Sequence, residues 1–110
     1  MKPAILRPKA RQDRQNEVRY YREVAGAAVA ESLVVAARDA LNHIRRNPGT
    51  GSPLLGKEIG IEGLRTWRLG SFPLLWVYFE LADALDVVRL LGERQDVASI
   101  LADGPSETEL

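Results

Sequence analysis

The 110-residue chain contains no cysteine and only one histidine, His43. The first absence excludes disulfides, thiolate metal sites and thiol nucleophiles, and the second excludes a histidine-rich metal centre. No apolar run approaches the roughly 20 residues that cross a bilayer, and the N-terminus lacks the apolar core of a signal peptide. We therefore expect a cytoplasmic protein that contacts no membrane and carries no metal or other cofactor.

The chain also has no net charge, because 15 basic residues balance 15 acidic ones. The charges are unevenly spread: basic residues predominate in residues 1–22, whereas residues 102–110 carry acidic charges only. Such asymmetry would steer a charged partner, or it reflects a solvated helix face and a loose tail.

Apolar residues at three- and four-residue spacing predict two helices. The short run Ala4–Leu6 is expected to be a first strand. One helical stripe then begins near Pro8 and stops at Gly26, and a second runs from Ala30 to Arg46. Two matching stripes joined at a glycine predict an antiparallel helical hairpin.

The period changes from 3.6 to 2 in the second half of the chain. Residues 47–63 are rich in glycine and proline and are expected to form a long connection. Three strands are predicted at Leu64–Leu69, Phe72–Leu81 and Leu85–Leu91, close enough in sequence to be antiparallel neighbours. Gln95–Leu101 has the pattern of a short last helix.

The resulting order of elements, β-α-α-β-β-β, predicts an α+β fold. The helical hairpin would pack on one face of a small antiparallel sheet. We expect a single domain over residues 1–101, followed by an acidic flexible tail at 102–110.

Five sequence features resemble, in the same order, the ParE branch of the ParE/RelE toxins. They are the aromatic pair of YYREVAG, the Asn-Pro-x-x-Gly break of ALNHIRRNPGTG, the Arg-x-Trp of GLRTWRLG, the aliphatic strand SFPLLWVYFE, and the final strand of VVRLLGERQDVASIL. The resemblance covers residues 4–101. It implies the toxin of a type II toxin–antitoxin pair, a system associated with plasmid stabilisation.

The resemblance also implies partners. In this superfamily a cognate antitoxin neutralises the toxin by wrapping a flexible C-terminal segment over the helical hairpin and sheet edge. ParE-like toxins with known targets poison DNA gyrase, whereas RelE-like relatives enter the ribosomal A site and cleave mRNA.

Ribonuclease chemistry requires groups that transfer protons near the working pH. The position of the superfamily's C-terminal histidine, aligned on RLLGERQD, holds Gly92, which has no side chain to do so. The expected Arg-Asp pair reads Gln95-Asp96. His43 lies on the second predicted helix, far in sequence from the sheet arginines, and is expected to be structural or solvent-facing. We therefore expect no catalytic residue.

Residues on or near the predicted sheet are the candidates for contacting the target: Arg65, Trp67, Arg68, Arg89, Arg94 and Asp96. The arginines would form a basic patch for carboxylates of a partner. Alternatively, they pair internally with Glu80, Asp86 or Asp96. Trp67 is either an interface anchor or a core residue, while Trp76 is expected in the core.

An apolar groove on the helical hairpin is expected to receive the antitoxin as an extended strand or an amphipathic helix. The candidate contacts are Val18, Tyr20, Tyr21, Leu33 and Leu41.

Three functional hypotheses remain at this stage. The first is a non-enzymatic toxin that binds DNA gyrase, and the second is a ribosome-dependent mRNA endonuclease. The third is a degenerate member that retains only antitoxin binding. None of the three requires direct sequence-specific binding of nucleic acid by the toxin alone.

Overall fold

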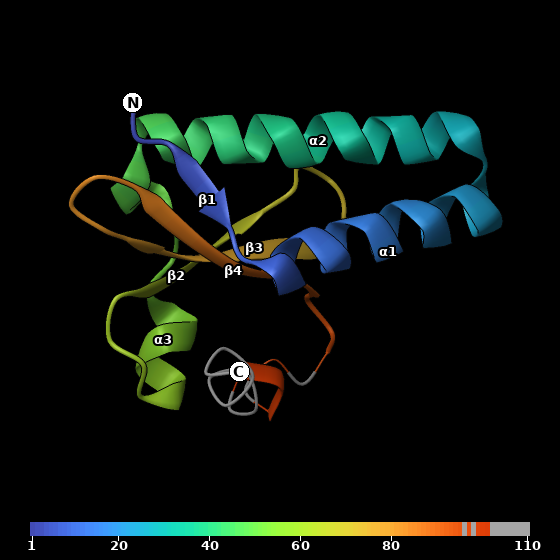
Figure 1. Cartoon of the computed structure of the whole chain (residues 1–110). Helices are drawn as coiled ribbons and strands as arrows, with labels where there is room; N and C mark the ends of the chain where they lie inside the picture. Colours follow the sequence, from blue (N-terminus) through green and yellow to red (C-terminus); the bar gives the residue numbers. More distant parts are fainter. Residues whose placement is uncertain (96, 98, 102–110) are drawn as a thin grey trace.

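The computed structural model describes residues 1–95, 97 and 99–101 of the chain (Figure 1). The predicted tail at 102–110 and the candidate Asp96 lie outside the described residues. The elements are β1 (Ala4–Leu6), α1 (Pro8–Ala25), α2 (Ala27–Arg46), a 3₁₀ turn (Pro48–Thr50), α3 (Leu54–Ile59), β2 (Leu64–Arg68), β3 (Leu74–Glu80) and β4 (Leu85–Gly92). Residues 97 and 99–101 are also helical. The predicted α+β order is confirmed.

The four strands form one sheet in the order β1-β4-β3-β2. The antiparallel meander of β2, β3 and β4 is confirmed. β1 differs, because it pairs with β4 in parallel, with Ala4 opposite Leu85. The sheet is therefore mixed and not wholly antiparallel. Local sequence patterns did not indicate this pairing, since the paired residues, such as Ala4 and Leu85, are 81 positions apart.

The helical hairpin covers one face of the sheet and extends beyond its edge (Figure 1). Its two helices meet at Gly26, whose φ of 94° suits a residue without a Cβ atom. Small residues of α2 let the sheet approach closely, and the indole Nε1 of Trp76 donates a hydrogen bond to the carbonyl of Ala37 at 3.1 Å. Trp76 is completely buried, as its apolar strand predicted.

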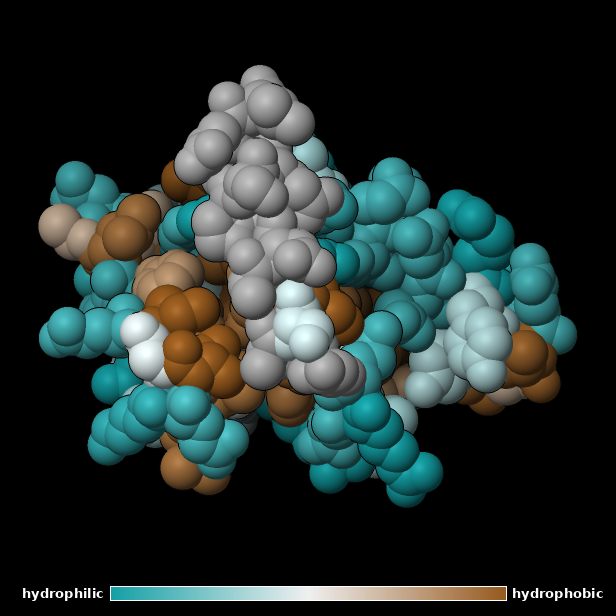
Figure 2. Space-filling model, turned by 90° about the horizontal axis from the view of Figure 1, so that it is seen from below, coloured by the Kyte–Doolittle hydropathy of each residue, from teal (hydrophilic) through white to brown (hydrophobic). Residues whose placement is uncertain are grey.

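The opposite face of the sheet is covered by α3 and by residues 97 and 99–101. Their apolar side chains form a second buried cluster, consisting of Leu64, Val77, Leu91, Val97 and Leu101. Further apolar residues around it are only partly buried, and Figure 2 shows them on this side of the molecule. The helical hairpin is therefore only one of two layers on the sheet.

The prediction of a long connection over residues 47–63 was wrong where α3 forms. Gly56 lies inside this short helix and lowers its intrinsic helix propensity, so the sequence pattern favoured a loop. A Cβ atom at Gly56 would come within 2.6 Å of the carbonyl oxygen of Ile61 and 2.8 Å of that of Leu64. Glycine thus permits α3 to approach β2, and tertiary packing overrides helix propensity here.

The loop before α3 is held by Tyr78, a fully buried residue of β3. The Tyr78 hydroxyl donates to the Pro48 carbonyl at 2.7 Å and accepts from the Gly51 N–H at 3.0 Å. A Cβ atom at Gly51 would collide with this hydroxyl. Burial raises the pKa of Tyr78, so the group stays a neutral hydrogen-bond donor. The Gly-Thr-Gly segment is therefore a structural loop.

Replacing Tyr78 by phenylalanine should lower the free energy of unfolding by about 1–3 kcal/mol, because it leaves the Gly51 N–H and the Pro48 carbonyl without their partner. Urea denaturation followed by tryptophan fluorescence measures this loss. The exposed Tyr20, changed to phenylalanine, is the matched control and should leave the midpoint unchanged. Equal midpoints for both variants would show that the hydroxyl does not hold the loop.

Candidate functional site

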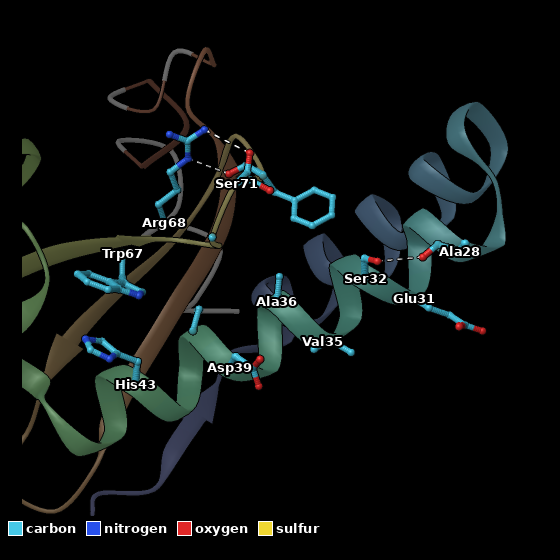
Figure 3. Close-up of a pocket in the computed structure, with 13 residues that line it drawn as sticks. Ala28, Glu31, Ser32, Val35, Ala36, Asp39, His43, Trp67, Arg68 and Ser71 are labelled. Carbon is cyan, nitrogen blue, oxygen red and sulfur yellow. Dashed lines mark hydrogen bonds between the residues drawn. The ribbon is translucent and has the colours of Figure 1, made fainter.

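Two surface grooves lie on opposite sides of α2. The first, called the Trp67 groove, runs between α2 and the β2–β3 turn (Figure 3). Its lining comes from the sheet side as Trp67, Arg68, Gly70, Ser71 and Phe72, and from the α2 side as Ala28, Glu31, Ser32, Val35, Ala36, Asp39, Ala40 and His43. The floor of the groove is apolar. Glu31 and Asp39 place two carboxylates on the rim formed by α2, and Arg68 places one guanidinium on the opposite rim.

The rings of His43 and Trp67 stack in this groove, with centroids 4.5 Å apart and planes inclined by 13° (Figure 3). The His43 Nε2 atom lies 3.5 Å from the Thr50 hydroxyl. Trp67 also packs against the core, so the stack fixes the orientation of its indole. The only histidine of the chain therefore forms part of the groove wall.

Arg68 braces the β2–β3 turn at the groove rim. Its Nε donates to the Phe72 carbonyl at 3.0 Å and its Nη2 to the Ser71 carbonyl at 3.4 Å. Its side chain is still half exposed, and the carboxylate of Glu93 lies 3.6 Å away. The structure therefore brings two of the target candidates, Trp67 and Arg68, together on one accessible surface.

Arg89, by contrast, is held inside the molecule. Its guanidinium forms two hydrogen bonds with Asp13 of α1, at 2.7 and 3.0 Å, and each side chain is only 15% exposed. The same carboxylate accepts the N–H of Leu90 at 3.0 Å. β1 pairs with β4 only as far as Val87. Beyond that point the Asp13 carboxylate, and not a neighbouring strand, accepts a backbone hydrogen bond from the edge of β4.

Asp13 and Glu17 lie one helical turn apart on α1, and the proximity of the two carboxylates has an electrostatic cost. Burial, and secondly the neighbouring Asp13 carboxylate, raises the pKa of Glu17. Internal pairing of Arg89 was one of the two alternatives considered from the sequence, and within the described part of the chain its guanidinium pairs with Asp13 of α1. Two of the expected partners are engaged elsewhere: Asp86 pairs with Arg7 and Glu80 with Lys2.

The remaining target candidates, Arg65 and Arg94, do not line the Trp67 groove. Arg65 donates to the Gly51 carbonyl at 2.7 Å and so braces the loop before α3. Arg94 is exposed in the turn after β4. Arg65, Arg68 and Arg89 thus each serve a different local structure and do not form the single basic patch that the sequence allowed.

The end of β4, where the superfamily's histidine position falls, is occupied by Gly92. Its N–H donates to the Gln95 side-chain oxygen at 2.6 Å. No cluster of three or more His, Cys, Asp or Glu that suits a metal is found among the described residues. None of the helices in the described part of the chain is long and apolar enough to cross a membrane.

The second groove, called the arginine groove, lies between α1 and α2 on the other side of α2. It consists of two adjoining hollows that share Arg14 and Arg38. Five arginines line it together with apolar residues: Arg14, Arg19, Arg22, Arg38 and Arg45, with Val18, Val34 and Leu41. Sequence reasoning missed Arg38 and Arg45, although their seven-residue spacing on α2 places them on one face, away from the buried stripe.

The candidates for antitoxin binding are divided between surface and core. Val18 and Leu41 line the arginine groove. Tyr20 is 56% exposed, while Tyr21 is mostly packed edge-on against Phe72. Leu33 is 1% exposed and lies in the core between hairpin and sheet, so it is a packing residue and presents no surface. Leu33 belongs to the apolar stripe of α2, and this stripe is the face on which the hairpin packs against the sheet, as the predicted fold requires.

A helical hairpin on a mixed four-stranded sheet, with grooves on both sides of α2, defines a small α+β protein. The family model described as the ParE toxin of the type II toxin-antitoxin system, parDE, matches residues 4–97. The chain belongs to the ParE toxin family of type II toxin–antitoxin systems.

A solved structure described as the chromosomal ParDE TA system from P. aeruginosa has a similar fold, with a TM-score of 0.70. The two chains share 19% sequence identity, and the match covers 84% of this chain and 96% of the other. A search of curated protein sequences gives no match.

Proposed function

We propose that this chain is a non-enzymatic toxin that acts in the cytoplasm by binding DNA gyrase, and that a cognate antitoxin holds it inactive. The observation that carries the proposal is the match to the ParE toxin family over residues 4–97. Gyrase as the target follows from the resemblance to ParE-like toxins with known targets. The antitoxin is proposed on the same basis and on the ParDE system to which the fold is similar.

The Trp67 groove is the surface we assign to the target. Tryptophan and arginine are enriched among residues that dominate binding energy, and this groove contains one of each at an accessible site. Its Trp67 indole is already oriented by His43, so little side-chain entropy is lost on binding. A preorganised anchor of this kind suits a protein partner.

The alternative function is a ribosome-dependent mRNA endonuclease. Gly92 at the end of β4 argues against it, because no side chain at that position can donate or accept a proton. The third possibility, a degenerate member that binds only its antitoxin, differs from the first in lacking an effect on gyrase.

The test is to add the purified toxin, free of antitoxin, to two reactions: gyrase supercoiling of relaxed plasmid and ribosome-programmed cleavage of mRNA. We expect inhibition of supercoiling, or accumulation of cleaved DNA, with intact mRNA. Cleaved mRNA with normal supercoiling would favour the endonuclease. No effect in either reaction, combined with tight antitoxin binding, would favour the degenerate member.

The Trp67 groove can be tested in the same supercoiling assay. Trp67→Ala should raise the half-inhibitory concentration by about 30-fold, which corresponds to the roughly 2 kcal/mol of a binding hot spot. Arg46→Ala, at the exposed end of α2 and outside both grooves, is the control and should inhibit like the native protein. A Trp67→Ala protein that unfolds at the native midpoint and inhibits equally well would place the target surface elsewhere.

A further inference from the structure

The arginine groove concentrates positive charge in a chain whose net charge is zero. No aspartate or glutamate is found among the described residues that line its two hollows. The acidic residues of α2, Glu31 and Asp39, line the Trp67 groove on the other side of the helix. The fold thus produces a positive potential on one side of the hairpin, which favours an anionic ligand there.

These guanidinium groups are largely uncommitted to carboxylates. Within the described part of the chain, Arg14, Arg19 and Arg22 form no ion pair. Arg38 approaches Asp39 at 3.6 Å, where both side chains are 65% exposed. A pair so exposed contributes little and is screened by salt. The groove therefore keeps its positive charge available to a ligand from outside.

The apolar residues of the groove lie beneath this charge. Val18 and Leu41 are partly buried, and Val34 is 47% exposed. Arginine lays its methylene stem along apolar neighbours and keeps its charged head in solvent. Such an arrangement leaves the guanidinium groups at the surface, where a large anion can reach them.

The guanidinium groups stand in two rows, one on each helix. Arg14 and Arg22 of α1 are roughly 12 Å apart along the helix axis, and Arg38 and Arg45 of α2 roughly 10 Å. Each row spans about three phosphates of one DNA strand, which carries one charge per roughly 3.4 Å of duplex axis. Packed helices lie about 8–10 Å apart, a spacing between the roughly 6 and 12 Å widths of the two grooves of B-DNA. The two rows can therefore contact both strands across one groove.

We propose that the arginine groove binds the phosphate backbone of double-stranded DNA without sequence preference. The row on α1 contacts phosphates of one strand and the row on α2 those of the other, since a guanidinium fork binds two phosphate oxygens at once. Phosphates carry no base identity, so these contacts position the toxin on DNA without selecting a site. Binding of this kind is modest, with a Kd of about 10⁻⁴–10⁻⁶ M at physiological salt.

The choice of DNA as the polyanion rests on the proposed function, because gyrase is bound to DNA while it supercoils a plasmid. A toxin held on gyrase would meet this DNA at a high effective concentration, so that weak phosphate contacts suffice. The binding test itself uses the toxin alone and requires no gyrase.

The test is fluorescence anisotropy of a labelled DNA duplex of about 20 base pairs, titrated with the full-length toxin at about 0.05 to about 0.2 M salt. Arg22→Ala/Arg38→Ala removes one exposed guanidinium from each row. Lys57→Glu is the matched control, because it lowers the net charge by the same amount at an exposed position of α3, on the opposite face of the sheet.

We expect the native toxin to bind two duplexes of unrelated sequence equally well. The double variant should lose at least about tenfold in affinity and flatten the slope of log K against log salt by about 1.8, which is about 0.9 for each lost phosphate contact. Lys57→Glu should keep the native slope. The thermal midpoint of the double variant should stay native, because both substituted side chains are exposed.

Two further probes decide between DNA and other polyanions. An RNA duplex of the same length should bind at least about fivefold more weakly, because its wide minor groove and narrow major groove do not match the spacing of the rows. Equal or tighter binding of RNA would overturn the assignment to DNA. Polyglutamate that binds through Arg22 and Arg38, while the DNA duplex does not bind, would replace DNA with an acidic protein.

A double variant with the native affinity and salt slope would overturn the inference, and so would an equal loss in Lys57→Glu. The outcome is separable from that of the proposed function. No binding of DNA by a toxin that inhibits supercoiling removes the inference and leaves the proposed function. DNA binding that depends on Arg22 and Arg38, in a toxin without any effect on gyrase, does the reverse.

Discussion

Asp13→Ala is expected to lower the free energy of unfolding by about 3–5 kcal/mol, the range observed when one partner of a buried ion pair is removed. The Arg89 guanidinium would lose both of its hydrogen bonds to Asp13 while remaining 85% buried, and the Leu90 N–H would lose its acceptor at the edge of β4. Urea denaturation followed by tryptophan fluorescence measures the loss, since Trp76 is buried in the same core.

Two comparisons make this result specific. Asp39→Ala removes a carboxylate that is 65% exposed and should change stability by less than about 0.5 kcal/mol. The double variant Asp13→Ala/Arg89→Ala should be less destabilised than the sum of its single variants, because both partners of the ion pair are removed together. A loss below about 1 kcal/mol for Asp13→Ala would mean that water or another acceptor replaces the carboxylate.

Gly56→Ala is the second change with a large expected effect, and its sign is informative. Helix propensity alone predicts that alanine stabilises α3 by about 1 kcal/mol. The structure predicts the opposite, because the new Cβ would meet two backbone carbonyl oxygens at 2.6 and 2.8 Å, neither of which can rotate away. We expect a net loss of about 2–3 kcal/mol, as in an overpacked core.

Gly49→Ala provides the matched control for this variant. Gly49 precedes α3 in the same connection, and a Cβ atom there would meet nothing within 4 Å. Thermal unfolding of the two variants should therefore separate them clearly, with Gly49→Ala at or slightly above the native midpoint. If Gly56→Ala is as stable as the native protein, α3 does not need its close contact with β2.

Much of the fold could be predicted from sequence because its signals are local. The hairpin was defined by two long periodic stripes and the glycine between them, and the meander by alternation and short turns. α3 was missed because six residues with an internal glycine give almost no periodic signal. The parallel pairing of β1 depends on contacts between distant segments, which no local pattern encodes.

The candidate sites were harder to predict from local sequence patterns. From the sequence Trp67 was either an interface anchor or a core residue, and in the structure it both lines a groove beside Arg68 and packs against the core. Sequence reasoning did not identify Asp13 as a partner of Arg89, because the two residues are 76 positions apart and meet only when α1 lies along β4. The arginine groove requires the relative rotation of two helices, which periodicity does not give.

α2 acts as a partition between the two grooves, since the described linings of the Trp67 groove and the arginine groove have no residue in common. Side chains that point to one side of this helix can therefore be exchanged without altering the surface on the other.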